Sequence, residues 1–150
     1  MIEPLRIDFT VACSVEHAFA TFTRHTSLWW PSTHSFSGDP QLEVVIEPRV
    51  GGRIFERTSA GEEHDWGEIT GWDEPRTLSY LWHLGTERPR ATHVAIEFEA
   101  VGAEATEVRI THTGWEALGD DAAPWRDRNQ AGWAGVLDPY RAACGAPMAS

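Results

Sequence analysis

The sequence predicts an α+β fold in which a curved, seven-stranded antiparallel sheet is covered by one long C-terminal helix. Two patterns predict it. Seven short runs alternate apolar and polar residues, which is typical of half-buried strands. The segment 125–144 instead places its apolar residues three or four positions apart, as a helix does. Because the apolar face of a sheet must be buried and no other segment is long enough to cover it, this helix should lie across the sheet.

The first elements occupy the N-terminal quarter of the chain. Residues 5–12 alternate apolar and polar side chains and predict the first strand. Ser14 can cap the helix that follows, where apolar residues recur at helical spacing. A second short helix is expected over 27–30 and should end at Pro31, because the residue before a proline is pushed out of the helical region. Residues 32–40 are rich in Ser, Gly and Pro and predict a loop.

Six further strands follow with short turns between them, which favours successive antiparallel hairpins. They are expected over residues 42–47, 53–58, 65–72, 77–84, 92–100 and 107–113. The Gly51-Gly52 pair separates the first two of these strands. Phosphate-binding loops place their glycines before a helix, whereas no helix follows here. The pair therefore predicts a hairpin turn in which both glycines take positive φ angles.

Length and composition indicate one domain over residues 1–150, with its core at about 5–144. No apolar run approaches the roughly 20 residues that a membrane helix needs. The N-terminus shows no basic leader followed by an apolar core, so a cytoplasmic location is expected. Cys13 and Cys144 form no C-x-x-C motif and are expected to be free, buried thiols.

The charge pattern argues against several classes of partner and cofactor. The net charge is −11, and the 12 basic residues, all arginines, are scattered among 23 carboxylates. Nucleic-acid binding needs a clustered basic surface, so neither nucleic acid nor membrane is expected as a partner. The 7 histidines stand singly, without H-x-x-x-H or C-x-x-C spacing, and no metal or other cofactor is expected. A G-x-S-x-G nucleophile motif is also missing from the sequence.

Aromatic residues are the main candidates for a binding site. The sequence holds 8 tryptophans, which is more than core packing alone needs. Strand alternation and helix periodicity turn many aromatic side chains toward the space between sheet and helix. A mostly aromatic pocket with few polar groups suits a flat, apolar ligand. The candidates for lining this cavity are Trp29, Trp30, Trp66, Tyr80, Trp82, Phe98, His112, Trp115, Trp133 and Leu137.

His112 is the titratable candidate, because it continues the inward-facing positions of the last strand. It could hydrogen-bond a ligand or move a proton at one end of the cavity. The alternative is a core histidine whose ring is satisfied by its neighbours, the more common arrangement for a buried polar group. Tyr80 could offer a second polar contact to a ligand, or it could be a core residue whose hydroxyl is satisfied by its neighbours. His83 and His93 point to the opposite face and are expected to be solvated.

Two details of the aromatic positions remain open at this point. In the strand 65–72, Trp66 and Trp72 have the same parity and Ile69 the opposite one, so a β-bulge is possible between them. Trp29 and Trp30 should close one end of the cavity. One of the two is expected to pack inward while the other lines the entrance, unless both simply fill a small core.

Several short segments together resemble the SRPBCC (START-like) superfamily. They are Phe22 to Pro31 with its Trp29-Trp30-Pro31, Glu47 to Arg53, Asp65 to Glu68, Trp72 to Leu78, Thr111 to Trp115, and Gly132-Trp133. Within the superfamily the chain is similar to the AHSA-like branch, homologous to the C-terminal domain of the heat-shock chaperone ATPase activator. The resemblance covers about Leu5 to Cys144. It implies a helix-grip fold with a deep apolar cavity between sheet and helix, and no catalytic residue is shared across the branch.

The leading functional prediction is binding of an unidentified hydrophobic small molecule in this cavity, without established catalysis. A cyclase- or dehydratase-type enzyme, as in polyketide cyclase-like relatives, is one alternative. It would use His112 as acid or base, helped by Tyr80 or Glu68. A chaperone-cofactor-like interaction domain is the other alternative. The chain is expected to act as a monomer or homodimer, and the sequence does not identify the ligand.

Overall fold

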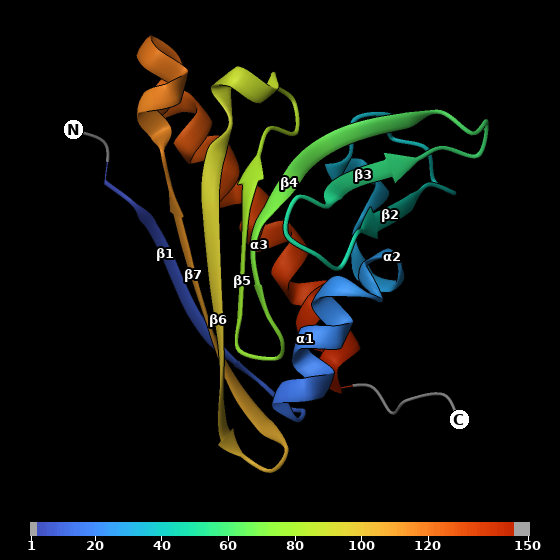
Figure 1. Ribbon diagram of the computed structural model, residues 1–150, viewed down its shortest axis with the longest axis vertical. Helices are drawn as coiled ribbons and strands as arrows, with labels where there is room; N and C mark the ends of the chain where they lie inside the picture. The colour runs from blue at the N-terminus through green and yellow to red at the C-terminus, as the bar shows by residue number, and fades with distance from the viewer. Residues whose placement is uncertain (1–2, 146–150) are drawn as a thin grey trace.

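The computed structural model describes residues 3–145 and confirms the predicted α+β, helix-grip fold (Figure 1). The strands are β1 (Leu5–Val11), β2 (Glu43–Ile46), β3 (Arg53–Arg57), β4 (Glu63–Asp73), β5 (Thr77–Trp82), β6 (Thr92–Gly102) and β7 (Ala105–Thr113). The helices are α1 (Val15–Thr23), α2 (Thr26–Trp29) and α3 (Ala122–Gly145). Short 3-10 turns lie at η1 (Ser32–His34), η2 (Arg88–Arg90) and η3 (Trp115–Asp121). Thus a 3-10 turn begins the segment predicted as loop.

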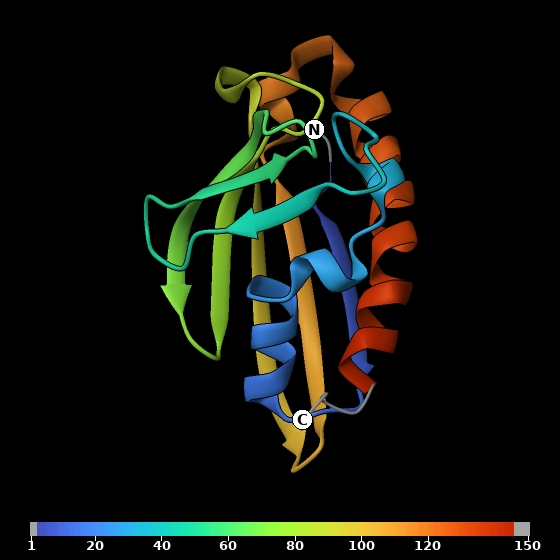
Figure 2. The same cartoon turned by 90° about the vertical axis from the view of Figure 1, so that its right-hand side faces the viewer.

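The seven strands form one antiparallel sheet in the order β1-β7-β6-β5-β4-β3-β2. From β2 to β7, strands that follow one another in the sequence are paired in the sheet. β1 pairs with β7 and not with β2. Figure 2 shows α3 on one side of the sheet, with α1 and α2 on the same side. Among residues 3–145, no helix combines the length and the apolar character needed to cross a membrane.

Irregular pairing in β4 explains the conflicting parity of its aromatic residues. The register with β3 shifts at Trp66, and the register with β5 shifts at Thr70. Because each shift adds one residue to β4, Trp66 and Ile69 can both be buried. Trp72 packs edge-on against Phe19, with ring centroids 5.1 Å apart. The β-bulge considered from the sequence is therefore confirmed.

The turn at Gly51-Gly52 is a hairpin connection between β2 and β3, as predicted, but the two glycines act differently. Only Gly51 has a positive φ angle, of 84°. A Cβ on Gly52 would lie 2.6 Å from the carbonyl oxygen of Glu47, so this position needs glycine for close backbone approach. The expectation of two positive φ angles was wrong, because the turn folds back on Glu47 instead of forming a two-residue hairpin.

Aromatic side chains form a packed core between the sheet and the C-terminal half of α3. Phe22 packs against Trp29 and Tyr140, at centroid distances of 5.3 and 5.4 Å. The Tyr140 hydroxyl donates to the carbonyl oxygen of Ala18 at 2.8 Å, which joins α3 to α1. Phe19 and Phe98 complete this packing, 5.2 Å apart. Aromatic side chains therefore pack beneath the C-terminal half of α3, whereas a pocket of about 530 Å³ lies along its N-terminal half.

Candidate ligand-binding cleft

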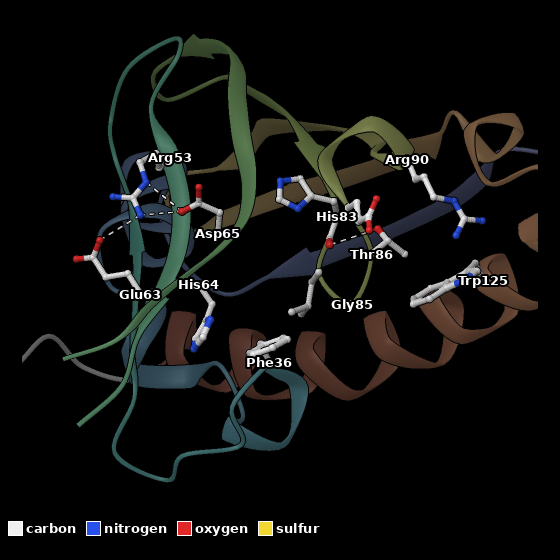
Figure 3. Close-up of a pocket in the computed structure, with 12 residues that line it drawn as sticks. Phe36, Arg53, Glu63, His64, Asp65, His83, Gly85, Thr86, Arg90 and Trp125 are labelled. Atoms are coloured by element: carbon white, nitrogen blue, oxygen red, sulfur yellow. Dashed lines mark hydrogen bonds and ion pairs between the residues drawn. The ribbon is translucent and has the colours of Figure 1, made fainter. Parts of the chain in front are cut away.

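Two adjoining pockets lie near the end of the molecule where α3 begins. The first, here called the indole pocket, has a volume of about 530 Å³ and includes Trp30, Trp82 and Trp133 in its lining. The second, here called the charged pocket, has a volume of about 820 Å³ and is drawn in Figure 3. The residues common to both pockets are Phe36, Leu84, Gly85 and Trp125. The two pockets therefore form one continuous cleft.

The walls of the indole pocket come from three separate elements. Trp30 follows α2, Trp82 ends β5, and Trp133 lies on the buried stripe of α3. The Trp30 indole N–H donates to the carbonyl oxygen of His34 at 2.9 Å, and that of Trp133 donates to His112 Nδ1 at 3.1 Å. Because these N–H groups are satisfied within the protein, the rings can present apolar surface to a ligand.

His112 lies behind this wall and is 0% exposed. Its Nδ1 accepts the Trp133 N–H, so in the neutral ring the proton must be on Nε2, 2.6 Å from the Thr92 hydroxyl oxygen. Thr92 in turn donates to the carbonyl oxygen of Trp82 at 3.3 Å. Burial, assisted by the nearby His93, lowers the pKa of His112 to about 3. The arrangement is that of a core histidine, and it connects two tryptophans of the indole pocket.

The other sequence-predicted candidates are buried and line neither pocket. They are Trp29, Trp66, Tyr80, Phe98, Trp115 and Leu137. Some support the lining residues directly: Trp66 lies 5.2 Å from Trp30, and Tyr80 lies 5.8 Å from Trp82, between ring centroids. The structure thus brings Trp30, Trp82 and Trp133 together in the pocket and places the remaining candidates in the core.

Phe36 and Trp125 line both pockets, although sequence reasoning did not select either as a site residue. Phe36 is 64% exposed, and its ring lies 4.4 Å from that of His64. Gly85 has a φ of 86°, and a Cβ there would come within 3.1 Å of the Trp125 ring. Glycine therefore allows the β5–β6 connection to contact the first turn of α3. The sequence signal that could have identified Phe36 is a large apolar residue within the otherwise polar segment 32–40.

Glu56 fixes the backbone at the mouth of the cleft, although it lines neither pocket. This β3 carboxylate is 0% exposed. It accepts the backbone N–H groups of Phe36 at 2.6 Å and Ser37 at 3.1 Å, the Ser37 hydroxyl, and the Trp66 indole N–H at 2.9 Å. Burial alone raises the pKa of a carboxyl group, but these four donors outweigh burial and lower the pKa of Glu56. The charged carboxylate thereby holds the loop that carries Phe36. Glu56 lies two residues after the buried Ile54 in β3, so both side chains should face the same side of the sheet. This sequence signal was missed.

The charged pocket has an ordered arrangement of ion pairs. Arg53 donates to Asp65 Oδ1 at 2.7 Å and to Glu63 at 3.1 Å. Arg90 donates to Asp121 at 2.9 Å and to the carbonyl oxygen of Leu118 at 3.0 Å. Figure 3 shows Asp65 between Arg53 and His83, with Arg90 and Trp125 at the other end of the pocket.

His83 lines the charged pocket and is half-buried, whereas strand parity predicted a solvated surface residue. The parity argument was wrong for His83 because β5 ends at Trp82 and the chain then turns through Gly85. Partial burial is the main cause that lowers the pKa of His83. His93 is also half-buried, and its Nε2 lies 3.4 Å from the Thr70 hydroxyl oxygen.

Comparisons with known proteins place these features in a family context. The family model described as Activator of Hsp90 ATPase homolog 1-like protein matches residues 12–143. The chain is similar to CalC, a self-sacrificing resistance protein from Micromonospora echinospora, with 30% identity and a TM-score of 0.71 over 94% of this chain and 93% of CalC. No curated protein sequence matches the chain.

Two further solved structures are similar. The anthrahydroquino-gamma-pyrone synthase Txn09, solved as a complex, shares 28% identity with a TM-score of 0.64 over 95% of this chain and 97% of Txn09. The Aha1 dimer from Colwellia psychrerythraea shares 17% identity with a TM-score of 0.70 over 99% of this chain and 100% of that chain. The second likeness shows the fold alone.

Proposed function

The chain belongs to the family of Activator of Hsp90 ATPase homolog 1-like proteins, and from this premise and the geometry of the cleft we propose that it binds a planar aromatic small molecule in the indole pocket. The observation that carries the proposal is the convergence of Trp30, Trp82 and Trp133 on one open pocket. Aromatic walls favour a flat ligand, because ring faces gain most from stacking and edge contacts. The polar residues of the lining, which include Ser35, Arg128 and Asn129, can bind polar substituents at its edge.

The comparisons support this ligand class. The name of Txn09 denotes a product with fused rings, and this protein shares 28% identity with the chain over nearly its full length. CalC, at 30% identity, is named as a self-sacrificing resistance protein, a different role from that of a synthase. A common fold at this level of identity is thus compatible with binding as well as with synthesis, so the choice between them depends on the site itself.

The site favours binding over acid–base catalysis by His112. A general acid or base must come within hydrogen-bond reach of the reacting group. His112 is 0% exposed, lines neither pocket and has a partner at each ring nitrogen. Tyr80 is likewise buried in the core, where burial raises the pKa of its hydroxyl far above the usual range. The chaperone-cofactor alternative has the family description behind it, but no feature of the cleft favours it.

We expect 9,10-anthraquinone to quench the tryptophan fluorescence and raise the melting temperature of the protein. Substitution of Trp82 by alanine should weaken its binding about tenfold, because one ring face of the pocket is lost. Titration followed by fluorescence and by calorimetry would measure the Kd for each variant.

Trp72→Ala provides the matched control, because Trp72 packs against Phe19 and lines neither pocket. Circular dichroism should first show that both variants are folded. Equal weakening by the two substitutions would contradict the proposed location. The absence of binding to the wild-type protein across a panel of planar aromatic compounds would contradict the proposed function.

A further inference from the structure

The charged pocket adjoins the indole pocket and has an excess of carboxylates. Its lining includes two arginines, Arg53 and Arg90, and three carboxylates, Glu63, Asp65 and Glu87. Both arginines are held in ion pairs, one with Glu63 and Asp65 and the other with Asp121, which lies outside the lining. Both arginines therefore already have carboxylate partners, whereas some carboxylate oxygens of the lining have no side-chain partner within residues 3–145.

Two acceptors in particular remain available. Both hydrogen bonds from Arg53 to Asp65 end on Oδ1, so within residues 3–145 no side-chain partner occupies Oδ2. The Glu87 carboxylate makes no ion pair within the same range. Partial burial lowers the pKa of His83, so its ring adds no positive charge near neutral pH. The pocket can therefore receive one more cation without displacing an existing pair.

Trp125, which lines both pockets, already contacts a cation. The Arg128 guanidinium lies over the Trp125 ring at 4.7 Å, which shows that this indole already takes part in a cation–π contact. Arg128 lines the indole pocket and not the charged pocket, and within residues 3–145 it makes no ion pair with Asp65 or Glu87. Its charge instead makes the indole pocket the less favourable half of the cleft for a cation.

We propose that the ligand of this protein is a planar aromatic molecule with a positively charged amine substituent, and that the charged pocket receives the ammonium group beside Asp65 and Glu87. This inference rests on the proposed function, because the ring system would occupy the indole pocket. The arm that joins the two parts would cross the shared residues Phe36, Leu84, Gly85 and Trp125. An ammonium group supplies three donors to carboxylate oxygens, and the excess of carboxylates in the pocket attracts its positive charge.

Two nearly isosteric probes test the inference. 1-(Butylamino)anthraquinone and 1-(3-aminopropylamino)anthraquinone differ only in a terminal methyl or ammonium group. We expect the ammonium probe to bind the wild-type protein about tenfold more tightly at low ionic strength, and this preference to decline with added salt. Glu87→Gln and Asp65→Asn should each reduce the preference, measured as the ratio of the two Kd values in the same variant, about threefold.

Glu104→Gln is the matched control, since it removes the same charge from the exposed β6–β7 turn at the opposite end of the sheet (Figure 1). An unchanged preference in this control, together with the loss in Glu87→Gln, supports the site. Equal binding of the two probes to the wild-type protein overturns the inference and leaves the proposed function intact. An equal loss in the control assigns the preference to the overall acidity of the chain and also overturns it. If neither probe binds, the proposed function fails as well.

Discussion

Substitution of Glu56 by alanine is expected to lower the free energy of unfolding by about 3 kcal/mol or more. The carboxylate is 0% exposed and accepts four hydrogen bonds. Its removal leaves the N–H groups of Phe36 and Ser37 and the indole N–H of Trp66 without their acceptor. Each buried donor that loses its partner costs about 1–3 kcal/mol, although opening of the loop to water recovers part of this cost. Urea unfolding measures the change.

Glu56→Gln distinguishes the charge from the shape of the side chain. The amide keeps the volume of the carboxylate but replaces one acceptor oxygen with an NH₂ group, which faces donors here. We expect it to be destabilising by at least half as much as alanine. Glu43→Ala, on an exposed position of β2, should change stability by less than about 0.5 kcal/mol. Equal effects of Glu56→Ala and Glu43→Ala would show that the buried network contributes nothing.

The Glu56 variants should also weaken ligand binding. The loop that Glu56 holds carries Phe36, which lines both pockets. When the loop loses its anchor, Phe36 no longer has a fixed position and the ligand must order it on binding. We therefore expect a several-fold higher Kd for 9,10-anthraquinone in Glu56→Gln at temperatures where the variant is fully folded. An unchanged Kd would mean that the loop does not contribute to the binding site.

The fold was predictable because its signals are local. Alternation of apolar residues defines which face of a strand is buried, and helical spacing defines the buried stripe of α3. The same signals correctly turned Trp82 and Trp133 toward the space between sheet and helix. Even the irregular parity of β4 was visible, because Trp66 and Ile69 cannot share a face in a regular strand.

The depth of each aromatic side chain was not predictable, because it depends on contacts between distant segments. Trp30 and Trp66 are both inward-facing, yet Trp30 lines the pocket and Trp66 lies behind it. Gly135 gives another example. A Cβ at Gly135 would lie 2.6 Å from His34 Nε2, so glycine allows η1 to pack against α3. Nothing in the helical pattern of 125–144 indicates that a loop residue approaches there.

Polar residues of the cleft escaped prediction for the same reason. Glu56 is buried only because the loop after η1 supplies donors to it. The charged pocket combines β3, β4 and the β5–β6 connection, and no sequence motif joins these segments. Charged residues near hairpin ends are usually solvated, so their assembly around one cleft is visible only in three dimensions.

The stability of the protein is expected to depend on pH through His112. Burial lowers the pKa of this ring in the folded state to about 3, whereas the unfolded chain has the ordinary value of about 6.5. Between these values the unfolded state binds a proton that the folded state does not, so stability is complete above about pH 6.5 and falls as the pH decreases. The loss is roughly 1.4 kcal/mol for each pH unit in this window.

Protonation of His112 should also loosen the walls of the indole pocket. A buried histidine without bonds to these walls would not have this effect. A proton on Nδ1 removes the acceptor of the Trp133 indole N–H, and the histidine in turn orients Thr92, which donates to the Trp82 carbonyl. We therefore expect His112→Gln to lose most of the pH dependence of stability between pH 5 and 6.5, while the partly exposed His93→Gln keeps it. Urea unfolding across this range measures the slope. The same slope in His112→Gln and wild type would mean that another group carries the proton, and the link between His112 and the pocket walls would then have no consequence for stability.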